Sequence, residues 1–147
     1  MICSYVAAPS NLTYSHNRNI PEPAGLTELI RILWAQSLID RVEKNLGYDS
    51  YLDFLRASVS LRQQDHASTL GYLERAIESE PDYEPAYGEK LRVLTMQKKY
   101  DKAVEWLDTM CEKLKREPAE LVLLTPEYSE FMQSNEYRQW RKLKESK

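Results

Sequence analysis

The chain has 147 residues, of which 42% are hydrophobic and 29% are charged, a balance typical of one globular domain. Its 4 glycines and 7 prolines are too few for a turn-rich β-sandwich. The net charge of −3 argues against a global basic field that would bind nucleic acid.

The cysteines and the N-terminus bear on the compartment. Cys3 and Cys111 are too few and too far apart for a disulfide framework or a zinc site, which favours a reducing environment. The first ten residues lack the basic and apolar regions of a signal peptide. The longest apolar stretch is interrupted by Glu28, Arg31 and Gln36. We therefore expect a cytoplasmic protein without membrane insertion.

Residues 1–25 contain four Pro or Gly residues and no helical period, which predicts an extended N-terminal arm. In residues 26–47, apolar residues recur at steps of three and four and predict one long amphipathic helix that ends at Gly47. The predicted stripe consists of Leu26, Leu29, Ile30, Leu33, Trp34, Leu38, Val42 and Leu46. Because burial of one stripe does not offset the cost of ordering the helix, we expect neighbouring helices to cover it.

Two segments, 50–83 and 84–117, match each other when residue 50 is aligned with residue 84, and we call this shift the repeat interval. The matches are Val59 with Val93, Gln63 with Gln97, His66 with Tyr100, Leu70 with Val104, Tyr72 with Trp106, Leu73 with Leu107, Ala76 with Met110 and Glu78 with Glu112. Each segment is predicted to form two amphipathic helices joined by a short polar turn, RQQD or QKK. The same register makes residues 26–47 equivalent to the second helix of a pair.

In this register, residues 50–115 resemble the tetratricopeptide repeat family. The residues that fit its pattern are Ala57, Leu73, Ala76 and Pro81 in the first unit, and Tyr87, Leu94, Tyr100, Ala103 and Leu107 in the second. Asp53 and Thr69 depart from the pattern, because a bulky residue and an alanine are usual there. The resemblance implies an all-α fold, a short right-handed α-α superhelix or TPR-like solenoid, formed by one domain over residues 26–147.

Residues 118–147 are predicted to form a degenerate repeat that closes the array. A proline in mid-helix costs about 3 kcal/mol, so we place a turn at 118–124 and begin a short helix at Thr125 and Pro126. A last helix is predicted to be capped by Ser134. This tail also resembles the two short helices that often close bacterial tetratricopeptide arrays.

Catalytic and metal-binding patterns are weak. His66 occupies an aromatic packing position, and Cys111 lies on a helix face beside Met110, where it is predicted to be a small buried hydrophobe. The carboxylates at Glu78, Glu80, Asp82 and Glu84 lack the spacing of a calcium loop. We therefore expect no enzyme, no cofactor, no metal and no small-molecule substrate.

The resemblance implies that the first helix of each pair, helix A, lines a concave surface. The predicted partner-binding residues there are Tyr51, Phe54, Leu55, Ser58, Arg62, Glu89, Arg92 and Met96. In an alternative interpretation, Tyr51, Leu52 and Leu55 pack against the first long helix. The predicted function is a non-catalytic module that binds a protein or peptide.

Two alternative functions stay open. The chain could instead be a structural subunit held by its arm and cap surfaces. The less favoured alternative is that it binds nucleic acid through C-terminal cations interleaved with Tyr137 and Trp140. In the favoured interpretation of this segment, the cations complement the dipole of the last helix and the two rings pack inward.

Overall fold

The computed structural model describes residues 24–115 and 126–145, and all regular structure in these ranges is helical. The elements are α1 (Ala24–Leu46), α2 (Ser50–Arg62), α3 (His66–Ser79), α4 (Glu84–Met96), α5 (Tyr100–Leu114), the 3-10 helix η1 (Pro126–Tyr128), α7 (Ser129–Met132) and α8 (Asn135–Glu145). The all-α prediction is confirmed for this part of the chain. The prediction that the arm extends to residue 25 is wrong, because Ala24 and Gly25 belong to α1. The rest of the predicted arm and the predicted turn at 118–124 lie outside the described residues.

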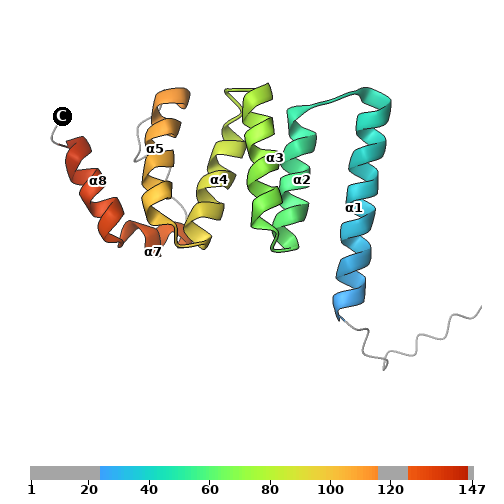
Figure 1. The fold of residues 1–147 in the computed structure, drawn as a ribbon, viewed down its shortest axis with the longest axis horizontal. Helices are drawn as coiled ribbons and strands as arrows, with labels where there is room; N and C mark the ends of the chain where they lie inside the picture. The colour runs from blue at the N-terminus through green and yellow to red at the C-terminus, as the bar shows by residue number, and fades with distance from the viewer. Residues whose placement is uncertain (1–23, 116–125, 146–147) are drawn as a thin grey trace, which may run out of the picture.

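The helices α1 to α5 and α8 lie side by side in a row, and the direction of the chain alternates from α1 to α5 (Figure 1). Each helix of α1 to α5 contacts the next one, and α8 contacts α5. The short elements after residue 125 return to the row, because η1 contacts α4 and α7 contacts α8. The row therefore begins with α1 and ends with α8.

The two helical hairpins, α2–α3 and α4–α5, have the same turn. Gln64 and Lys98, which are separated by the repeat interval, adopt left-handed φ angles of 60° and 55°. In both turns the next residue donates a 3.0 Å backbone hydrogen bond to a carbonyl five residues earlier, from Asp65 to Ser60 and from Lys99 to Leu94. Non-glycine residues seldom adopt this conformation, so its recurrence shows that the repeat interval of the sequence is also present in the backbone.

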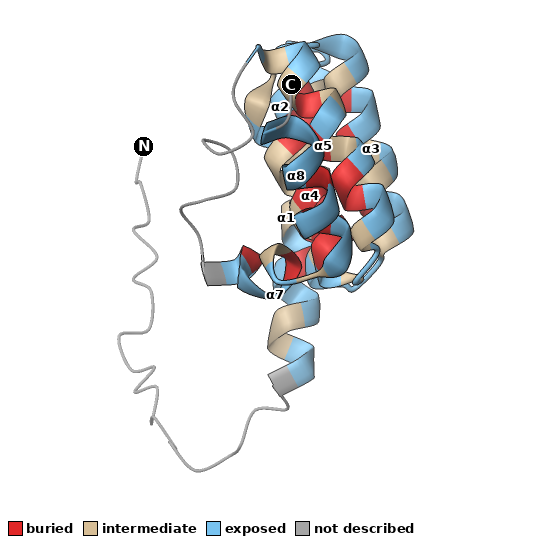
Figure 2. Ribbon diagram, turned by 90° about the vertical axis from the view of Figure 1, so that its left-hand side faces the viewer, coloured by how far each residue is buried: buried red, intermediate tan, exposed pale blue. Residues whose placement is uncertain are grey.

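The core lies between the helices of the row, where the buried positions are found in Figure 2. Ala57, Ala76 and Ala86 are fully buried, and such small side chains allow α2, α3 and α4 to approach closely. Leu73 and Leu107, equivalent residues of the two hairpins, are also fully buried. This matched position of the repeat thus lies in the core of both hairpins.

The predicted apolar stripe of α1 is wrong. The residues of α1 that α2 buries are Ile32 and Ile39, with Ala35 and Val42 packed beside them. Apart from Val42, every residue of the predicted stripe is exposed. The reason is that α1 has apolar residues on two sides, and α2 covers one side only. The first turns of α1 also extend beyond the end of α2 (Figure 1).

Local signals at the ends of helices were predicted correctly. Gly47 follows the last residue of α1 and has a φ of 92°, a conformation that glycine adopts without strain. Ser134 precedes α8, and its hydroxyl oxygen accepts a 3.2 Å hydrogen bond from the backbone N–H of Tyr137. Pro126 is the first residue of η1, while the predicted cap at Thr125 lies outside the described residues.

Candidate protein-interaction surfaces

An aromatic group lies on α2 and on the loop between the hairpins. The rings of Tyr51 and Phe54 are stacked with their centroids 6.3 Å apart, and Tyr83 meets Phe54 edge-on at 5.8 Å. Tyr51 is 52% exposed, whereas Phe54 and Tyr83 are half-buried. We call these three residues the aromatic group. Its outer side, formed by Tyr51, is open to solvent.

Two acidic side chains lie near the aromatic group, and hydrogen bonds hold them in place. The Asp49 carboxylate accepts a 2.8 Å hydrogen bond from the backbone N–H of Tyr51 and thereby caps α2. The Glu80 carboxylate accepts a hydrogen bond from the hydroxyl of Ser50. Burial, Tyr51 and these two negative charges raise the pKa of the Tyr83 hydroxyl. The surface therefore combines aromatic rings with fixed anions.

The other predicted residues of α2 are engaged within the chain. Leu55 packs against the α1–α2 cluster, as does Leu52, whereas Tyr51 remains exposed. The Ser58 hydroxyl donates a 3.1 Å hydrogen bond to the carbonyl of Phe54. Arg62 is exposed and forms an ion pair of 3.6 Å with a residue of α1, Glu28. Of the predicted residues on α2, Tyr51 is thus the apolar side chain most open to a partner.

Two of the three predicted residues of α4, Arg92 and Met96, line a separate hollow, and the third, Glu89, contacts Arg92. The Nε of Arg92 donates a 2.9 Å hydrogen bond to the carboxylate of Glu89, and this bond raises the pKa of Arg92. Met96, one turn further along α4, is 55% exposed. The hollow has a volume of about 350 Å³ and is lined by Arg92, Thr95, Met96, Lys98, Tyr100, Glu127, Glu130 and Phe131.

The sequence did not reveal the C-terminal wall of this hollow. Lys98 forms a 2.6 Å ion pair with Glu130, which is distant from it in the chain. The same contact lowers the pKa of the Glu130 carboxyl. No local pattern in a sequence reports a pairing over this separation. The structure therefore divides the eight predicted residues into an α2 group and an α4 group beside the C-terminal segment.

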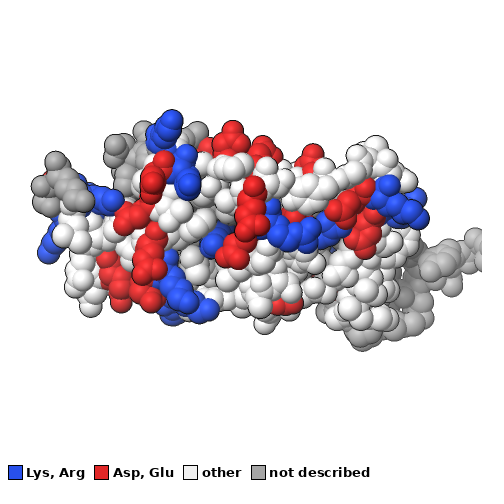
Figure 3. All heavy atoms as spheres, turned by 45° about the horizontal axis from the view of Figure 1, so that its top comes forward, with Lys and Arg blue, Asp and Glu red and all other residues white. Residues whose placement is uncertain are grey.

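Ion pairs connect neighbouring helices at the same positions of the repeat. Asp40 of α1 pairs with Arg56 of α2 at 2.9 Å, and Glu74 of α3 pairs with Lys90 of α4 at 2.8 Å. In both pairs the two partners are 16 residues apart in the chain. The second pair lies one repeat interval after the first. Figure 3 shows acidic and basic side chains interleaved on one face of the molecule. This arrangement supports α1 as an equivalent of α3.

Asp53, a departure from the repeat pattern, is fully buried. Its carboxylate accepts a 2.9 Å hydrogen bond from the Tyr48 hydroxyl and lies 3.4 Å from Arg56 and 3.3 Å from Arg75. Burial by itself would lower the pKa of Arg56. The hydrogen bonds from Arg56 to Asp40 and Glu43 have the larger combined effect, so its pKa is raised above the ordinary value. The negative charge of buried Asp53 is therefore balanced by Arg56 of α2 and Arg75 of α3.

The C-terminal aromatic residues pack inward. Tyr137 and Trp140 are buried against α5 and α7. The indole N–H of Trp140 donates a 2.8 Å hydrogen bond to Asp108, which also pairs with Lys144 at 2.6 Å. Base stacking needs an open ring face, so the inward interpretation of these rings is the one that the structure supports.

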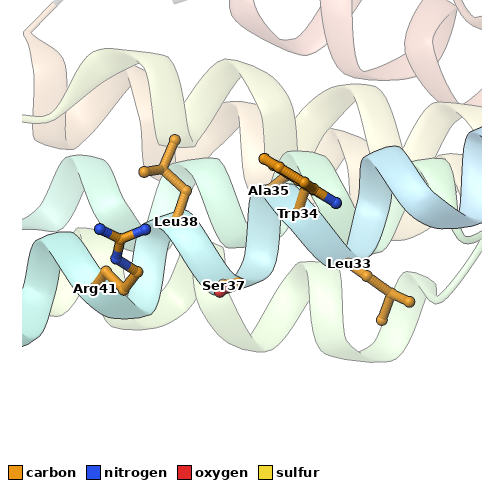
Figure 4. A pocket seen from close by; sticks show the side chains of 6 residues that line it. All are labelled: Leu33, Trp34, Ala35, Ser37, Leu38 and Arg41. Atoms are coloured by element: carbon orange, nitrogen blue, oxygen red, sulfur yellow. The ribbon is translucent and has the colours of Figure 1, made fainter. Parts of the chain in front are cut away.

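The outer face of α1 is apolar and open. Six large side chains on it are between 46% and 74% exposed: Leu26, Leu29, Ile30, Leu33, Trp34 and Leu38. We call these six residues the α1 face. A hollow of about 500 Å³ lies against it and is lined by Leu33, Trp34, Ala35, Ser37, Leu38 and Arg41 (Figure 4). Sequence periodicity identified these apolar residues but assigned them to the core.

His66 and Cys111 are side chains that the sequence offered as candidates for other kinds of site. His66 and Cys111 are half-buried, so the prediction that Cys111 is buried holds only in part. In residues 24–115 and 126–145, no helix is long and apolar enough to cross a membrane, and no group of three metal-ligating side chains is found. Comparisons with known protein families, curated proteins and solved structures find no match to this chain.

Proposed function

We propose that the protein is a non-catalytic interaction module that binds a segment of another protein through the first helices of its hairpins, α2 and α4. The observation that carries this proposal is the exposure of two large apolar side chains, Tyr51 on α2 and Met96 on α4. Residues next to them in the same helices are buried. Tyrosine and methionine are both enriched in protein interfaces. Binding, with no chemical step, is the activity that this arrangement supports.

The surroundings of Tyr51 suggest the chemistry of the partner segment. An apolar or aromatic side chain would lie on the exposed ring of Tyr51, which is already stacked on Phe54. A lysine or arginine next to it would face the fixed carboxylates of Asp49 and Glu80. The partner segment is therefore expected to combine an apolar anchor with a cation.

The resemblance to tetratricopeptide repeats supports the same function. The equivalent turns at Gln64 and Lys98 and the ion pairs that recur at the repeat interval are expected if structural repeats stack in the same way on their neighbours. We propose that the row of helices is a short right-handed superhelix of this kind. Its α2 and α4 surfaces would then face the partner.

The test is a comparison of surface variants in affinity purification from the native source, read by mass spectrometry. The variant Tyr51→Ala/Met96→Ala changes two exposed side chains, so it should keep the circular dichroism of the wild type. We expect it to lose proteins that the wild type retains. Leu143→Ala on α8, which changes a side chain that is 66% exposed, is the matched control and should retain them. Equal retention by all three proteins would contradict the proposal.

A second candidate function is that of a structural subunit that assembles through the α1 face. The observation that favours it is the clustering of six exposed large apolar side chains on one helix. Contiguous apolar patches of several hundred Å² on a protein surface mark interaction sites. The α1 face is distinct from Tyr51 and Met96, so the two functions are compatible in one protein.

A further inference from the structure

We infer that the α1 face pairs with the α1 face of a second copy of this chain, so that the protein is a two-fold symmetric dimer. This inference rests on the assembly role proposed above and is independent of the Tyr51 and Met96 surface. The partner is specified by the size of the face, by its place in the row of helices and by the charges around it.

The size of the α1 face fits one half of a dimer interface. Five aliphatic side chains and one tryptophan, each about half exposed or more, present on the order of 500 Å² of apolar surface. A standard interface buries about 800 Å² on each partner. Homodimer interfaces are about 65% apolar, so each partner contributes about 500 Å² of apolar surface. The α1 face therefore supplies the apolar part of such an interface without any other surface.

The face is placed where a second copy extends the row. Ile32 and Ile39 attach α1 to α2, and the α1 face points away from them on the other side of the helix. Positions 26, 30, 33 and 37 follow one another at steps of four and three, the spacing at which side chains of two packed helices interlock. Ser37 is small and lines the hollow beside Trp34, so it leaves room for a large side chain of the second copy (Figure 4).

A two-fold axis closes such an assembly. The face lies at one end of the row, and α8 lies at the other end (Figure 1). When the same patch is used by both copies, no second patch is needed and the assembly stops at two. In the described part of α8, the large hydrophobic side chain that is exposed is Leu143, and the cations Lys142 and Lys144 flank it, so head-to-tail stacking of α1 on α8 is disfavoured.

The charges around the face permit self-association. Arg41 lines the hollow, and Asp40, its neighbour in the chain, is held by Arg56 of α2. Lys44 follows one turn later, so both signs occur at the C-terminal border of the face. The net charge of the chain is only −3, and two copies therefore repel each other weakly.

The test measures the molar mass of the full chain by light scattering during size-exclusion chromatography, from 1 to about 200 μM, the range in which dimers of standard interface size form. The wild type is expected at twice 17.3 kDa. The variant Leu33→Glu/Trp34→Glu places four charges in the paired faces, so its mass should halve to that of one chain. Leu29→Lys, on another turn of the face, is a second variant with the same expected loss. Leu143→Glu, an exposed leucine on α8, should remain dimeric.

Two results would overturn the inference. A wild type that has the mass of one chain at all concentrations would mean that another partner, or the segment of the chain that precedes α1, covers the face. Dimeric α1 variants with the circular dichroism of the wild type would mean that the copies associate elsewhere. The Tyr51→Ala/Met96→Ala variant separates the two proposals, because it should lose the partner protein and keep the mass of a dimer.

Discussion

Helix α1 and the two hairpins differ in how tightly the rest of the chain fixes their faces. In the hairpins, α3 lies between α2 and α4, so both of its sides are covered. Helix α1 packs on α2 through Ile32 and Ile39, while its other side exposes Trp34 and its neighbours. The same kind of apolar periodicity therefore produced a core in the hairpins and an open surface in α1. Periodicity identifies a helix, but its neighbours decide which side is buried.

The largest expected effect separates the hairpin core from α1. Leu107→Ala removes a fully buried side chain from the largest cluster and should lower the free energy of unfolding by about 2–5 kcal/mol. Leu73→Ala, its equivalent in the first hairpin, should cost a similar amount. Leu46→Ala on α1 changes a side chain that is 84% exposed and should stay within about 0.5 kcal/mol of the wild type. Urea denaturation measures all three, and equal costs at Leu46 and Leu107 would refute the contrast.

A smaller effect is expected at the contact between α1 and the first hairpin. Arg56 pairs with Asp40 and Glu43 of α1 and with fully buried Asp53, so Arg56→Met leaves these carboxylates with one cation fewer. We expect a loss of roughly 3 kcal/mol in denaturation experiments.

The matched control for Arg56 is Arg62→Met. Arg62 is also on α2 and also pairs with a carboxylate of α1, but both partners are more exposed. Exposed pairs contribute about 0–1 kcal/mol, so this variant should be close to the wild type. If Arg62→Met lowered the free energy of unfolding as much as Arg56→Met, burial of the ion pairs around Asp53 would not explain the loss at Arg56.

The smallest of the three effects is a pH dependence that arises beside the second hairpin. Burial and the charge of Glu127 raise the pKa of Tyr128 to about 12, and its hydroxyl donates a 3.4 Å hydrogen bond to the carbonyl of Gly88. The folded protein keeps this proton after the unfolded chain has lost it near pH 10. The stability contributed by neutral Tyr128 is therefore complete below pH 10 and is lost as the pH rises to 12, by roughly 2 kcal/mol.

Tyr128→Phe tests this pH dependence, because the variant has no proton to lose at this position. Its free energy of unfolding should fall less than that of the wild type between pH 10 and 12, as measured by urea denaturation at each pH. Other tyrosines, such as Tyr83 and Tyr87, also have raised pKa values. The free energy of unfolding of the variant should therefore still fall in part over this pH range. Helix α1 contains no tyrosine and should contribute nothing to the part of the fall that arises from tyrosines. Equal falls in both proteins would contradict the assignment to Tyr128.

The candidate surfaces were only partly predictable. The resemblance to tetratricopeptide repeats selected Tyr51 and Met96 as residues of the first helix of each pair, and both are exposed. It also selected Leu55, which α1 covers, since no local pattern states how far a preceding helix extends over its neighbour. The α1 face was found as a set of apolar residues, but its exposure follows from the absence of a described helix on that side of α1.

The sequence by itself determined which segments are helices, where Gly47 and Ser134 terminate or begin them, and the repeat interval between the hairpins. These features depend on side chains within a few residues of one another, so their physical causes are local. Only the tertiary structure decided which side of α1 is buried, which cations compensate Asp53, and that Glu130 closes the hollow beside Met96. These contacts join helices distant in the chain, and they form because the packed row brings together groups that no local pattern relates.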